Sequence, residues 1–417
     1  MPPHPTRPAT PRGLVLAMLL LVYIFNFLDR QILSILAQPV KADLRLDDGQ
    51  LGMLGGFAFA LLYSTLAIPL AMLADRTSRS WVIAVSLGVW SAFTALCGSA
   101  QTFTSMFLFR LGVGVGEAGG VAPSYALIAD AYPAERRSRA LSIYSLGIPL
   151  GSAGGALLGG YIAQTVEWRT AFLVVGLLGL AIAVPFKLLV RDPPRATPAK
   201  DQVPLSHVFG ILAAKPSFWL LAFGAAAGSM CGYGVAFWLP SLILRSFRLD
   251  LAQVGQFFGA LALTGGVAGI LLGGWLGDRL GRRDRKWYAL APAICYVLGL
   301  PLFVAGVLAQ SWQAAFLLFL VPQALVYVWL GPVLTAVQHL VPPQMRATAS
   351  ASFLLINNLM GLGAGPWVIG LLSTQLTPAY GAADGLRYAI AAGLGLYLVA
   401  GILMALASNR LAADWVE

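Results

Sequence analysis

Twelve long apolar segments constrain this chain more than any other feature of its sequence. Each has about the 20 residues that an α-helix needs to cross the hydrocarbon core of a bilayer. Charged residues make up 11% of the 417 residues, against about 25% in soluble domains. We therefore predict an all-α membrane protein with spans at residues 14–38, 49–73, 82–101, 104–131, 140–163, 169–190, 217–241, 251–276, 287–309, 313–340, 347–372 and 386–407.

The longest polar stretch divides these segments into two sets of six. It begins at Arg191-Asp192-Pro193-Pro194 and is rich in proline and charge. The predicted parts are a cytoplasmic tail over 1–13, an N-terminal six-helix bundle over 14–190, a cytoplasmic linker over 191–216, a C-terminal six-helix bundle over 217–407 and a second cytoplasmic tail over 408–417.

Basic residues are distributed unevenly between the two sides of the membrane. With the N-terminus inside, 19 of the 27 Lys and Arg fall on the cytoplasmic side and six on the other, while Arg30 and Arg110 lie within segments. Cytoplasmic loops carry an excess of Lys and Arg, so this pattern places both termini in the cytoplasm and predicts a multi-pass protein of the plasma (inner) membrane. The net charge of +10 is a topology signal, and we expect no nucleic-acid partner.

Four charged side chains lie deep inside the apolar segments, all in the first half: Asp29, Arg30, Arg110 and Glu117. A charge at bilayer depth costs about 2.5–3.5 kcal/mol on insertion scales, so it is rarely kept without a use. The helical rise places Asp29 and Arg110 at similar depths, and Glu117 is two turns further along the face that carries Arg110. These residues predict a proton-coupled site for an anion, with a structural ion pair between helices as the alternative.

The charges of this cluster offer a physical basis for coupling two solutes. They sum to zero when both carboxylates are ionised, so a bound proton leaves +1 and favours an anionic head group. An anion near the guanidiniums in turn favours protonation of the neighbouring carboxylate. Asp29 and Glu117 are the predicted proton sites, and Arg30, Arg110 and the adjacent Asn26 are predicted substrate contacts, because arginine binds phosphate and carboxylate through its planar fork.

Other chemistries fit the sequence less well. It contains no Gly-x-x-x-x-Gly-Lys-Ser/Thr loop, which argues against ATP-driven transport. The three histidines are scattered without metal-ligand spacing, and the three cysteines fall inside apolar segments. No His or Lys lies deep in a span, which argues against a lipid-modifying membrane enzyme. We expect no enzymatic activity, no metal and no cofactor besides a proton gradient.

The loop after the second segment is echoed in the second half. Asp75 and Asp278 occupy equivalent places in Ala71-Met72-Leu73-Ala74-Asp75-Arg76-Thr77-Ser78-Arg79 and Gly274-Trp275-Leu276-Gly277-Asp278-Arg279-Leu280-Gly281-Arg282-Arg283. A Gly-x-x-x-Asp-Arg-x-Gly-Arg-Arg loop in each half resembles the major facilitator superfamily. The first copy departs from the pattern, with Ala71 and Ser78 in place of the glycines and Ser80 in place of the last basic residue.

A narrower resemblance covers the first five segments. Asn26-Phe27-Leu28-Asp29-Arg30 resembles the Asn-Tyr-x-Asp-Arg motif of spinster-like transporters, and the runs from Arg110 to Ala118 and from Leu141 to Ser152 are similar to that group as well. The Asn-x-x-Asp-Arg opening and the Gly-Glu-Ala also occur in organic anion:cation symporters of the superfamily. The second half resembles the superfamily alone.

The resemblance implies two six-helix halves that alternate access to a central cavity lined by the first and fourth helices. It implies that the aspartate of the first helix binds a proton and that the arginines contact substrate or gate. It also implies a gate network at the cytoplasmic helix ends, for which the alternative is topology charge with incidental pairing: Asp75, Arg76, Arg79, Asp130, Arg136, Asp278, Arg279 and Arg282.

The second half has no charge deep in its segments. Its candidate cavity residues are polar or aromatic: Tyr233, Trp238, Gln323, Tyr327, Trp329, Asn357 and Asn358. A cavity charged on one side and apolar on the other suits an amphipathic anion. Spinster-like transporters are associated with lysophospholipids and sphingosine phosphate, so the resemblance implies a solute of that kind. The alternative is a small organic-acid anion taken up with a proton. We expect the bilayer and this solute as partners, and a monomer.

Overall fold

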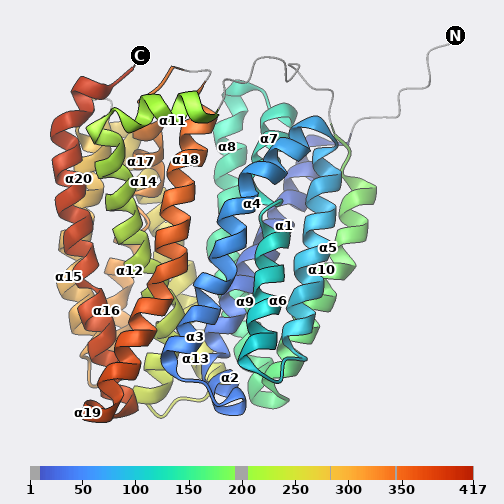
Figure 1. Ribbon diagram of the computed structural model, residues 1–417, viewed down its shortest axis with the longest axis vertical. Coiled ribbons are helices and arrows are strands. Elements are labelled where there is room, and N and C mark those ends of the chain that lie inside the picture. The colour runs from blue at the N-terminus through green and yellow to red at the C-terminus, as the bar shows by residue number, and fades with distance from the viewer. Residues whose placement is uncertain (1–9, 193–204, 282, 343–344, 417) are drawn as a thin grey trace, which may run out of the picture.

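The computed structural model describes residues 10–192, 205–281, 283–342 and 345–416. Within these residues every regular element is a helix, and the helices form two bundles side by side (Figure 1). Both termini lie at one end of the bundles, which we name the terminal end; the opposite end is the far end. The described parts of the predicted tails and linker all lie at the terminal end.

Ten helices build the six crossings of the N-terminal half, because four of the crossings are each divided into two helices. The helices are α1 (Arg12–Ile35), α2 (Ala37–Leu44), α3 (Asp48–Gly55), α4 (Phe57–Arg76), α5 (Arg79–Cys97), α6 (Phe103–Glu117), α7 (Val121–Ala131), α8 (Ala134–Ser145), α9 (Gly147–Thr165) and α10 (Trp168–Leu189).

The C-terminal half repeats this plan with different breaks. Its elements are α12 (Pro216–Ser246), α13 (Leu251–Leu261), the π-helical turn η1 (Ala262–Gly266), α14 (Val267–Gly281), α15 (Trp287–Val307), α16 (Trp312–Leu325), α17 (Leu330–Gln338), α18 (Arg346–Asn357), the π-helical turn η3 (Asn358–Ala364), α19 (Gly365–Gly393) and α20 (Gly395–Asp414). Helix α19 turns back at Gly381, whose φ of 79° lies in the left-handed region that favours glycine.

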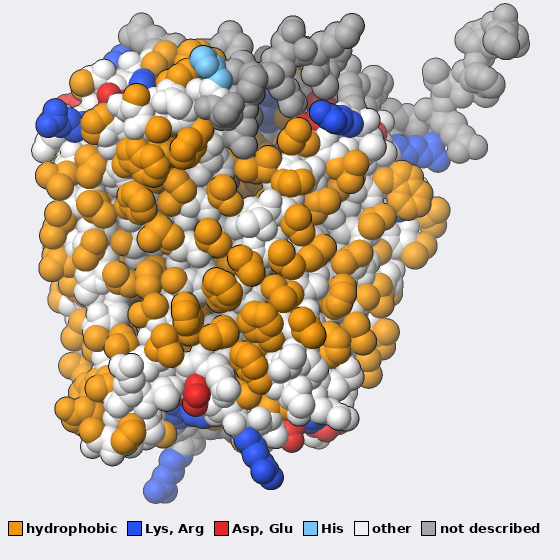
Figure 2. Space-filling model, in the orientation of Figure 1, with side chains coloured by type: hydrophobic (Ala, Val, Ile, Leu, Met, Phe, Trp, Pro, Cys, Tyr) orange, Lys and Arg blue, Asp and Glu red, His pale blue; other side chains and the backbone are white. Residues whose placement is uncertain are grey.

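The structure confirms the twelve predicted crossings. Ten helical stretches among the described residues are long and apolar enough to span a membrane. The longest, Thr348–Asp414, doubles back at Gly381 and so crosses twice. The fourth crossing is not among the ten because it is broken after Glu117, but α6 and α7 cover it together. On the face seen in Figure 2, apolar side chains cover the middle and charged side chains gather toward the two ends.

One helix was not predicted. The sequence indicated a polar linker over 191–216, and residues 193–204 of it lie outside the described residues. The remainder forms α11 (Leu205–Ala213), which runs across the terminal ends of the C-terminal helices (Figure 1). Phe209 of this helix meets Phe218 and Trp219 of α12 edge to face, so the end of the linker packs onto the bundle.

The backbones of α9 in one half and α13 in the other meet at close range. A Cβ atom at Gly160 of α9 would collide with the carbonyl oxygen of Leu251 in α13, and one at Gly255 of α13 would collide with that of Ala156 in α9. Only glycine fits at either position. Small residues of this kind let membrane helices pack at close range, and this reciprocal contact forms a seam between the halves near the far end.

Candidate functional site

The four deep charges predicted from the sequence come together in the interior of the N-terminal half. Asp29, Arg110 and Glu117 are 2%, 2% and 0% exposed, and the Arg30 side chain is 13% exposed. Asp29 and Arg30 lie on α1, while Arg110 and Glu117 lie on α6. Burial of this kind removes each charge from water, so its partners decide what the cluster can do.

Glu117 is held by two donors from α1. Arg30 Nε and Asn26 Nδ2 both donate to Glu117 Oε2 at 2.8 Å. Glu117 is the last residue of α6, and Ala118, Gly119 and Gly120 make a short turn before α7 begins. The helix break therefore presents this carboxylate to α1, where a charge-assisted pair stabilises its ionised form.

Asp29 has different support. Its Oδ2 accepts one hydrogen bond, from Thr94 Oγ1 of α5 at 2.7 Å, and its Oδ1 is buried without a partner among the described residues. Arg110 lies within electrostatic range of both Asp29 and Glu117. The direct ion pair of the cluster is the one between Arg30 and Glu117.

The cluster keeps spare hydrogen-bonding capacity. Arg110 Nε and Nη1, Arg30 Nη2, Asp29 Oδ1 and Glu117 Oε1 are buried without partners among the described residues. Buried polar groups are normally satisfied, and each one left unmade costs about 1–3 kcal/mol. Two guanidiniums with free N–H groups can bind an anion, and two carboxylates with free oxygens can exchange protons.

Aromatic rings surround the guanidiniums. The Arg30 Cζ lies 5.0, 4.9 and 4.6 Å from the ring centroids of Phe27, Phe59 and Tyr63, and the Arg110 Cζ lies 5.5 Å from Phe59. Cation–π contact stabilises a guanidinium that has little water around it. Phe59 and Tyr63 of α4 were not predicted as site residues; their spacing of four, which places them on one face of a helix, was the available signal.

Tyr233 and Tyr327 are the C-terminal candidates that the structure brings toward this cluster. Tyr233 of α12 lies within electrostatic range of Arg30 across the interface, and Tyr327 is similarly close to Tyr233. Both are partly exposed. They supply the opposite side of the central region with aromatic surface.

The other C-terminal candidates have partners within their own half. Asn357 is 2% exposed and accepts a hydrogen bond from Ser229 at 2.8 Å, with Asn358 3.4 Å from its amide nitrogen. Trp329 packs against Phe353, and Gln323 lies against Gly265. The structure therefore places these side chains in the packing between C-terminal helices.

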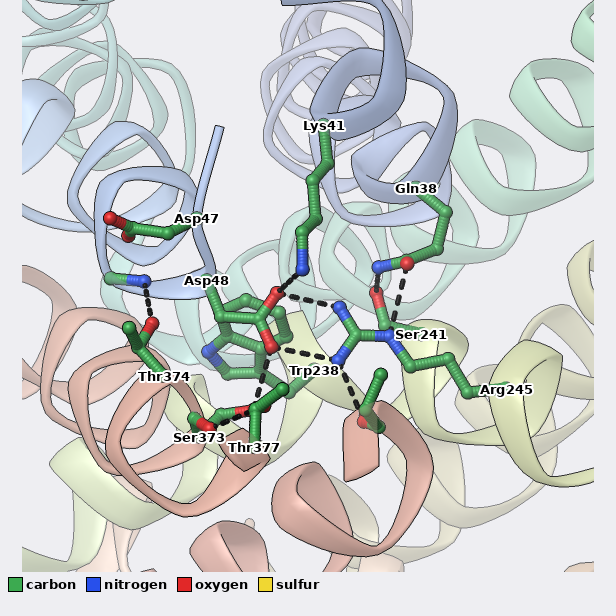
Figure 3. A network of polar contacts seen from close by, with 12 residues as sticks. Gln38, Lys41, Asp47, Asp48, Trp238, Ser241, Arg245, Ser373, Thr374 and Thr377 are labelled. Carbon is green, nitrogen blue, oxygen red and sulfur yellow. Dashed lines mark hydrogen bonds and ion pairs between the residues drawn. The ribbon is translucent and has the colours of Figure 1, made fainter. Parts of the chain in front are cut away.

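Trp238 lies away from the cluster. It is 0% exposed, its Nε1 donates to Pro366 O at 2.7 Å, and it lies beside a polar network at the far end (Figure 3). In this conformation Trp238 belongs to the closed end of the molecule, and the structure does not bring it to the charged cluster.

The first copy of the predicted gate network assembles at the terminal end. Arg79 pairs with Asp75 at 2.9 Å and also with Asp130 of α7. Arg79 thereby ties the start of α5 to the ends of α4 and α7. Arg76 and Arg136 are exposed, and no contact of theirs contributes to this tie among the described residues.

The second copy is arranged differently. Asp278 and Arg279 are exposed, and Arg279 Cζ lies 5.4 Å from the Trp275 ring. Arg282 lies outside the described residues. The tie that Arg79 makes in the first half has no described counterpart here.

A second ionic network, which the sequence analysis missed, joins the two halves at the far end (Figure 3). Asp48 is 2% exposed. Its carboxylate accepts from Arg245 Nη1 and Nη2 at 2.7 and 2.6 Å, from Lys41 Nζ at 2.6 Å and from Ser373 Oγ at 2.6 Å. Asp48 and Lys41 belong to the N-terminal half, and Arg245 and Ser373 to the C-terminal half.

Neighbouring contacts extend this network. We name its six residues the far-end lock: Gln38, Lys41, Asp48, Ser241, Arg245 and Ser373. Arg245 Nε donates to Gln38 Oε1 at 3.0 Å, and Gln38 Nε2 donates to Ser241 at 2.9 Å. The sequence showed Lys41 and Arg245 only as charges near segment ends. Asp48 and Arg245 are 197 residues apart, and no local pattern links them.

The described polar contacts between the halves are confined to one end. Hydrogen bonds that join them run from Ser34 to Phe237 O at 2.8 Å, from Leu251 N to Gln164 at 3.2 Å, from Gly49 N to Thr374 at 3.0 Å and through the far-end lock. All of these residues lie at or near the far end, so the halves are closed there.

Comparison with known proteins agrees with this architecture. The sequence profile described as "Major Facilitator Superfamily" matches residues 19–366. The chain belongs to the major facilitator superfamily. Over 401 residues it is 35% identical to an "MFS-type efflux pump" of Mycolicibacterium smegmatis, covering 96% of this chain and 93% of that one.

Within the superfamily the chain is a spinster-like transporter. It is 28% identical over 391 residues to "Protein spinster homolog 1" of Homo sapiens, covering 87% of this chain and 73% of that one. The crystal structure of a bacterial homologue of the human lysosomal transporter Spinster, in an inward-facing and occupied conformation, matches with a TM-score of 0.85 at 29% identity, covering 97% of this chain and 98% of that one. These comparisons confirm the predicted family and fold.

Proposed function

We propose that this transporter is proton-coupled and moves an amphipathic anion by alternating access. The observation that carries the proposal is the buried cluster of Asp29, Arg30, Arg110 and Glu117. Its four charges sum to zero when both carboxylates are ionised, and several of its donors and acceptors have no partner among the residues that the structure describes. A charged group at this depth in a membrane protein commonly marks a solute or proton pathway.

Two roles follow from the different environments of the carboxylates. Asp29 has one neutral donor, Thr94, and therefore takes and releases the coupled proton. Glu117, held by Arg30 and Asn26, responds when a bound anion competes for Arg30. Each solute then changes the affinity for the other by the same factor, as linkage requires.

The surroundings of the cluster support an amphipathic solute. The anionic head would meet Arg110 and Arg30, and the apolar body would lie against Phe59, Tyr63 and Tyr233. The names of the relatives point to the same class of protein, since the human relative is a spinster homologue. A lysophospholipid or a sphingosine-phosphate-like molecule has the required form.

We propose the plasma (inner) membrane as the location, with both termini in the cytoplasm. The uneven distribution of Lys and Arg supports this orientation. The far end then faces outward, and the contacts of the far-end lock close it. The structure matches a homologue in an inward-facing conformation, and we assign the same state to this chain.

One assay can test both the direction of transport and the alternative of a small organic-acid solute. The relative named as an efflux pump favours outward movement of the solute. The fully buried Arg110, with its two unpaired N–H groups, also suits a small organic-acid anion carried with a proton. Transport direction and a panel of solutes separate these possibilities.

The test is uptake and release in proteoliposomes under an imposed pH gradient, with lysophospholipids and small carboxylates as solutes. Asp29→Asn keeps the acceptor for Thr94 but cannot take up a proton, so we expect a folded protein without gradient-driven transport. Asp284→Asn, in an exposed loop between α14 and α15, is the control. Undiminished gradient-driven transport by Asp29→Asn would remove Asp29 from the proposal.

A further inference from the structure

A small cavity lies between α1, α5, α7 and α8. One of its lining residues, Asn26, donates a hydrogen bond to Glu117. Its walls include Val22, Tyr23, Asn26, Trp90, Val121 and Tyr144. Tyr23 and Tyr144 stack at 4.2 Å between centroids with an interplanar angle of 7°, and form one wall. The cavity leaves about 10 Å³ in which the centre of a water molecule can lie, which corresponds to about one molecule.

Two wall residues present unpaired polar groups. Asn26 is 2% exposed; its Nδ2 is committed to Glu117 Oε2, and its Oδ1 has no partner among the described residues. Trp90 is 1% exposed, and its Nε1 also lacks a described partner. An indole nitrogen only donates and an amide oxygen only accepts. Two of the residues that line the cavity thus offer one donor and one acceptor without a partner among the described residues.

We propose that this cavity is a binding site for a single water molecule, held by Trp90 Nε1 and Asn26 Oδ1. The water oxygen accepts from the indole N–H, and one water O–H donates to the amide oxygen. Both orphaned groups are satisfied by this one molecule, whereas a larger solute does not fit. The other walls are aromatic rings and valine side chains, so the water is oriented by these two contacts.

The water site is connected through Asn26 to the protonation of Glu117, and this part of the inference rests on the proposed function. While Glu117 is ionised it only accepts, so Asn26 must turn its NH₂ group toward it and its oxygen toward the water. When Glu117 carries a proton its hydroxyl donates to Asn26 Oδ1, and the amide rotates to place NH₂ at the water. Water accepts from that NH₂ and from Trp90 together, so it accommodates both states of Glu117.

The cavity lies close to the accessible surface of the protein. Tyr125 of α7 is 41% exposed and meets Tyr144 edge to face with 5.3 Å between centroids. One aromatic layer therefore separates the cavity wall from accessible surface.

Radiolytic hydroxyl labelling of the full-length protein in ¹⁸O-water tests the site directly, because bound water labels adjacent side chains that bulk water does not reach. We expect Trp90 and Tyr144, each 1% exposed, to be labelled at least several-fold faster than Trp238, which is 0% exposed and has its N–H bonded to Pro366. Val22→Ile should fill the cavity and abolish this excess. Val15→Ile is the matched control, since Val15 is 3% exposed like Val22 and lies two turns earlier on α1.

Equal labelling of Trp90 and Trp238 in the wild type would overturn the water site, as would unchanged labelling in Val22→Ile. Labelling needs neither substrate nor gradient, so this failure is distinguishable from failure of the proposed function. The link to Glu117 has its own readout, the pH midpoint of gradient-driven transport. Trp90→Phe removes one of the two contacts that hold the water next to Asn26 and should move that midpoint by roughly 0.3–1 pH unit.

Trp219→Phe is the control for that shift, because it also loses an indole donor, in this case to Ala213 O at 3.0 Å. A shift in both variants, or in neither, would overturn the connection between the water and Glu117. Measuring the midpoint as a pH, independent of the amount of protein inserted, keeps the result interpretable if Trp90→Phe is produced at a lower level.

Discussion

At the residue scale, the two buried carboxylates differ in what holds them. Glu117 Oε2 accepts from a guanidinium and an amide at 2.8 Å each, whereas the one donor to Asp29 within the described part of the chain is the Thr94 hydroxyl at 2.7 Å. A charged donor stabilises an ionised acceptor more than a neutral donor does. Identical chemical groups in one cluster can therefore serve as an anion-responsive partner and as a proton carrier.

Arg110→Ala should weaken binding of an anionic solute more than it weakens the fold. Arg110 makes no described ion pair, so its removal breaks no tie between helices. An anion would lose a charge-assisted partner worth roughly 1.5–3 kcal/mol, or about tenfold to more than a hundredfold in affinity. Titration calorimetry and thermal melting measure the two effects. Unchanged affinity with a collapsed melting temperature would show that Arg110 is structural.

Glu117→Gln should displace the pH profile of transport without abolishing it. Glutamine retains an oxygen for Asn26 and Arg30 but removes the titratable charge. Under a fixed gradient, wild type and variant should reach half-maximal uptake at different pH, whereas Asp29→Asn removes coupling altogether. Superimposable profiles would make Glu117 a spectator.

The depth and helix positions of these residues could be predicted from the sequence, because charge inside an apolar run and helical rise are local properties. Which of these charged side chains pair with each other could not be predicted. Arg30 and Arg110 are both near the carboxylates, and no local pattern in the sequence tells which of them pairs directly with Glu117. Phe59 and Tyr63 look like ordinary apolar-face residues in the sequence.

At the element scale, the positions of helix ends organise the site. The break after Glu117 turns the last carboxylate of α6 toward α1. At the terminal end, Asp192 beyond α10 accepts from Ser80 N in the first turn of α5 at 2.8 Å, and Lys187 of α10 donates to Ser80 Oγ at 2.7 Å. Asp192 thus satisfies a helix N-terminus from a distant part of the chain.

This contact has a testable pH dependence. Burial raises the pKa of Asp192, but hydrogen bonds from Ser80 and Ser78 and the charge of Lys187 outweigh it and hold that pKa below its ordinary value. A depressed carboxyl pKa gives stability that is present above about pH 4, the unfolded value, and lost as the pH falls through the folded value. Asp192→Asn keeps an acceptor for Ser80 N but loses the charge, so it should remove this acid-sensitive part, about 0.3–1 kcal/mol for a charge at a helix N-terminus.

The test is the difference in melting temperature between wild type and Asp192→Asn, measured on purified protein from pH 3 to pH 7. Asp250→Asn is the control, because Asp250 caps α13 through Gln253 N at 2.8 Å and asparagine caps equally well. A difference that stays constant with pH would mean that Asp192 acts through packing rather than charge.

The twelve spans could be predicted at this scale because hydrophobic length is a strong signal. The helix breaks could not, since glycine is common throughout these segments and only packing decides which glycines end a helix. Helix α11 was missed because it is short and follows a proline-rich stretch.

At the scale of the whole molecule, the far-end lock determines which side is closed. It gathers one buried carboxylate and two cations from both halves, and the two guanidinium contacts of Asp48 cross the interface. Removing one partner of a buried pair leaves the others uncompensated and is strongly destabilising. The closed far end therefore depends on Asp48.

Asp48→Asn should shift the population toward a state that is open at the far end. Spin labels on the far ends of α3 and α12 should move apart, and a pair on the terminal ends of α4 and α18 should move together. Asp43→Asn is the matched control, since Asp43 is also at the far end but pairs with Arg169 within the N-terminal half. No change of either distance in Asp48→Asn would show that the lock does not set the conformation.

Assignment to two six-helix halves could be made from the sequence, because the repeated Asp-Arg loops and the central linker mark them. The lock itself could not be predicted. Asp48 and Lys41 sit on the opposite half from Arg245, and only the packing of α3 against α19 brings Ser373 and Asp48 together.

The seam of Gly160 and Gly255 has a consequence for the speed of the cycle. Backbone contacts at these two glycines interlock no side chains, so rolling of one half over the other has to break the hydrogen bond from Leu251 N to Gln164 but meets no interlocked side chain at Gly160 or Gly255. The free-energy barrier to reorientation then comes mainly from breaking the polar contacts of Asp48. Turnover should follow the strength of that single network, and weakening it should flatten the dependence of transport rate on temperature.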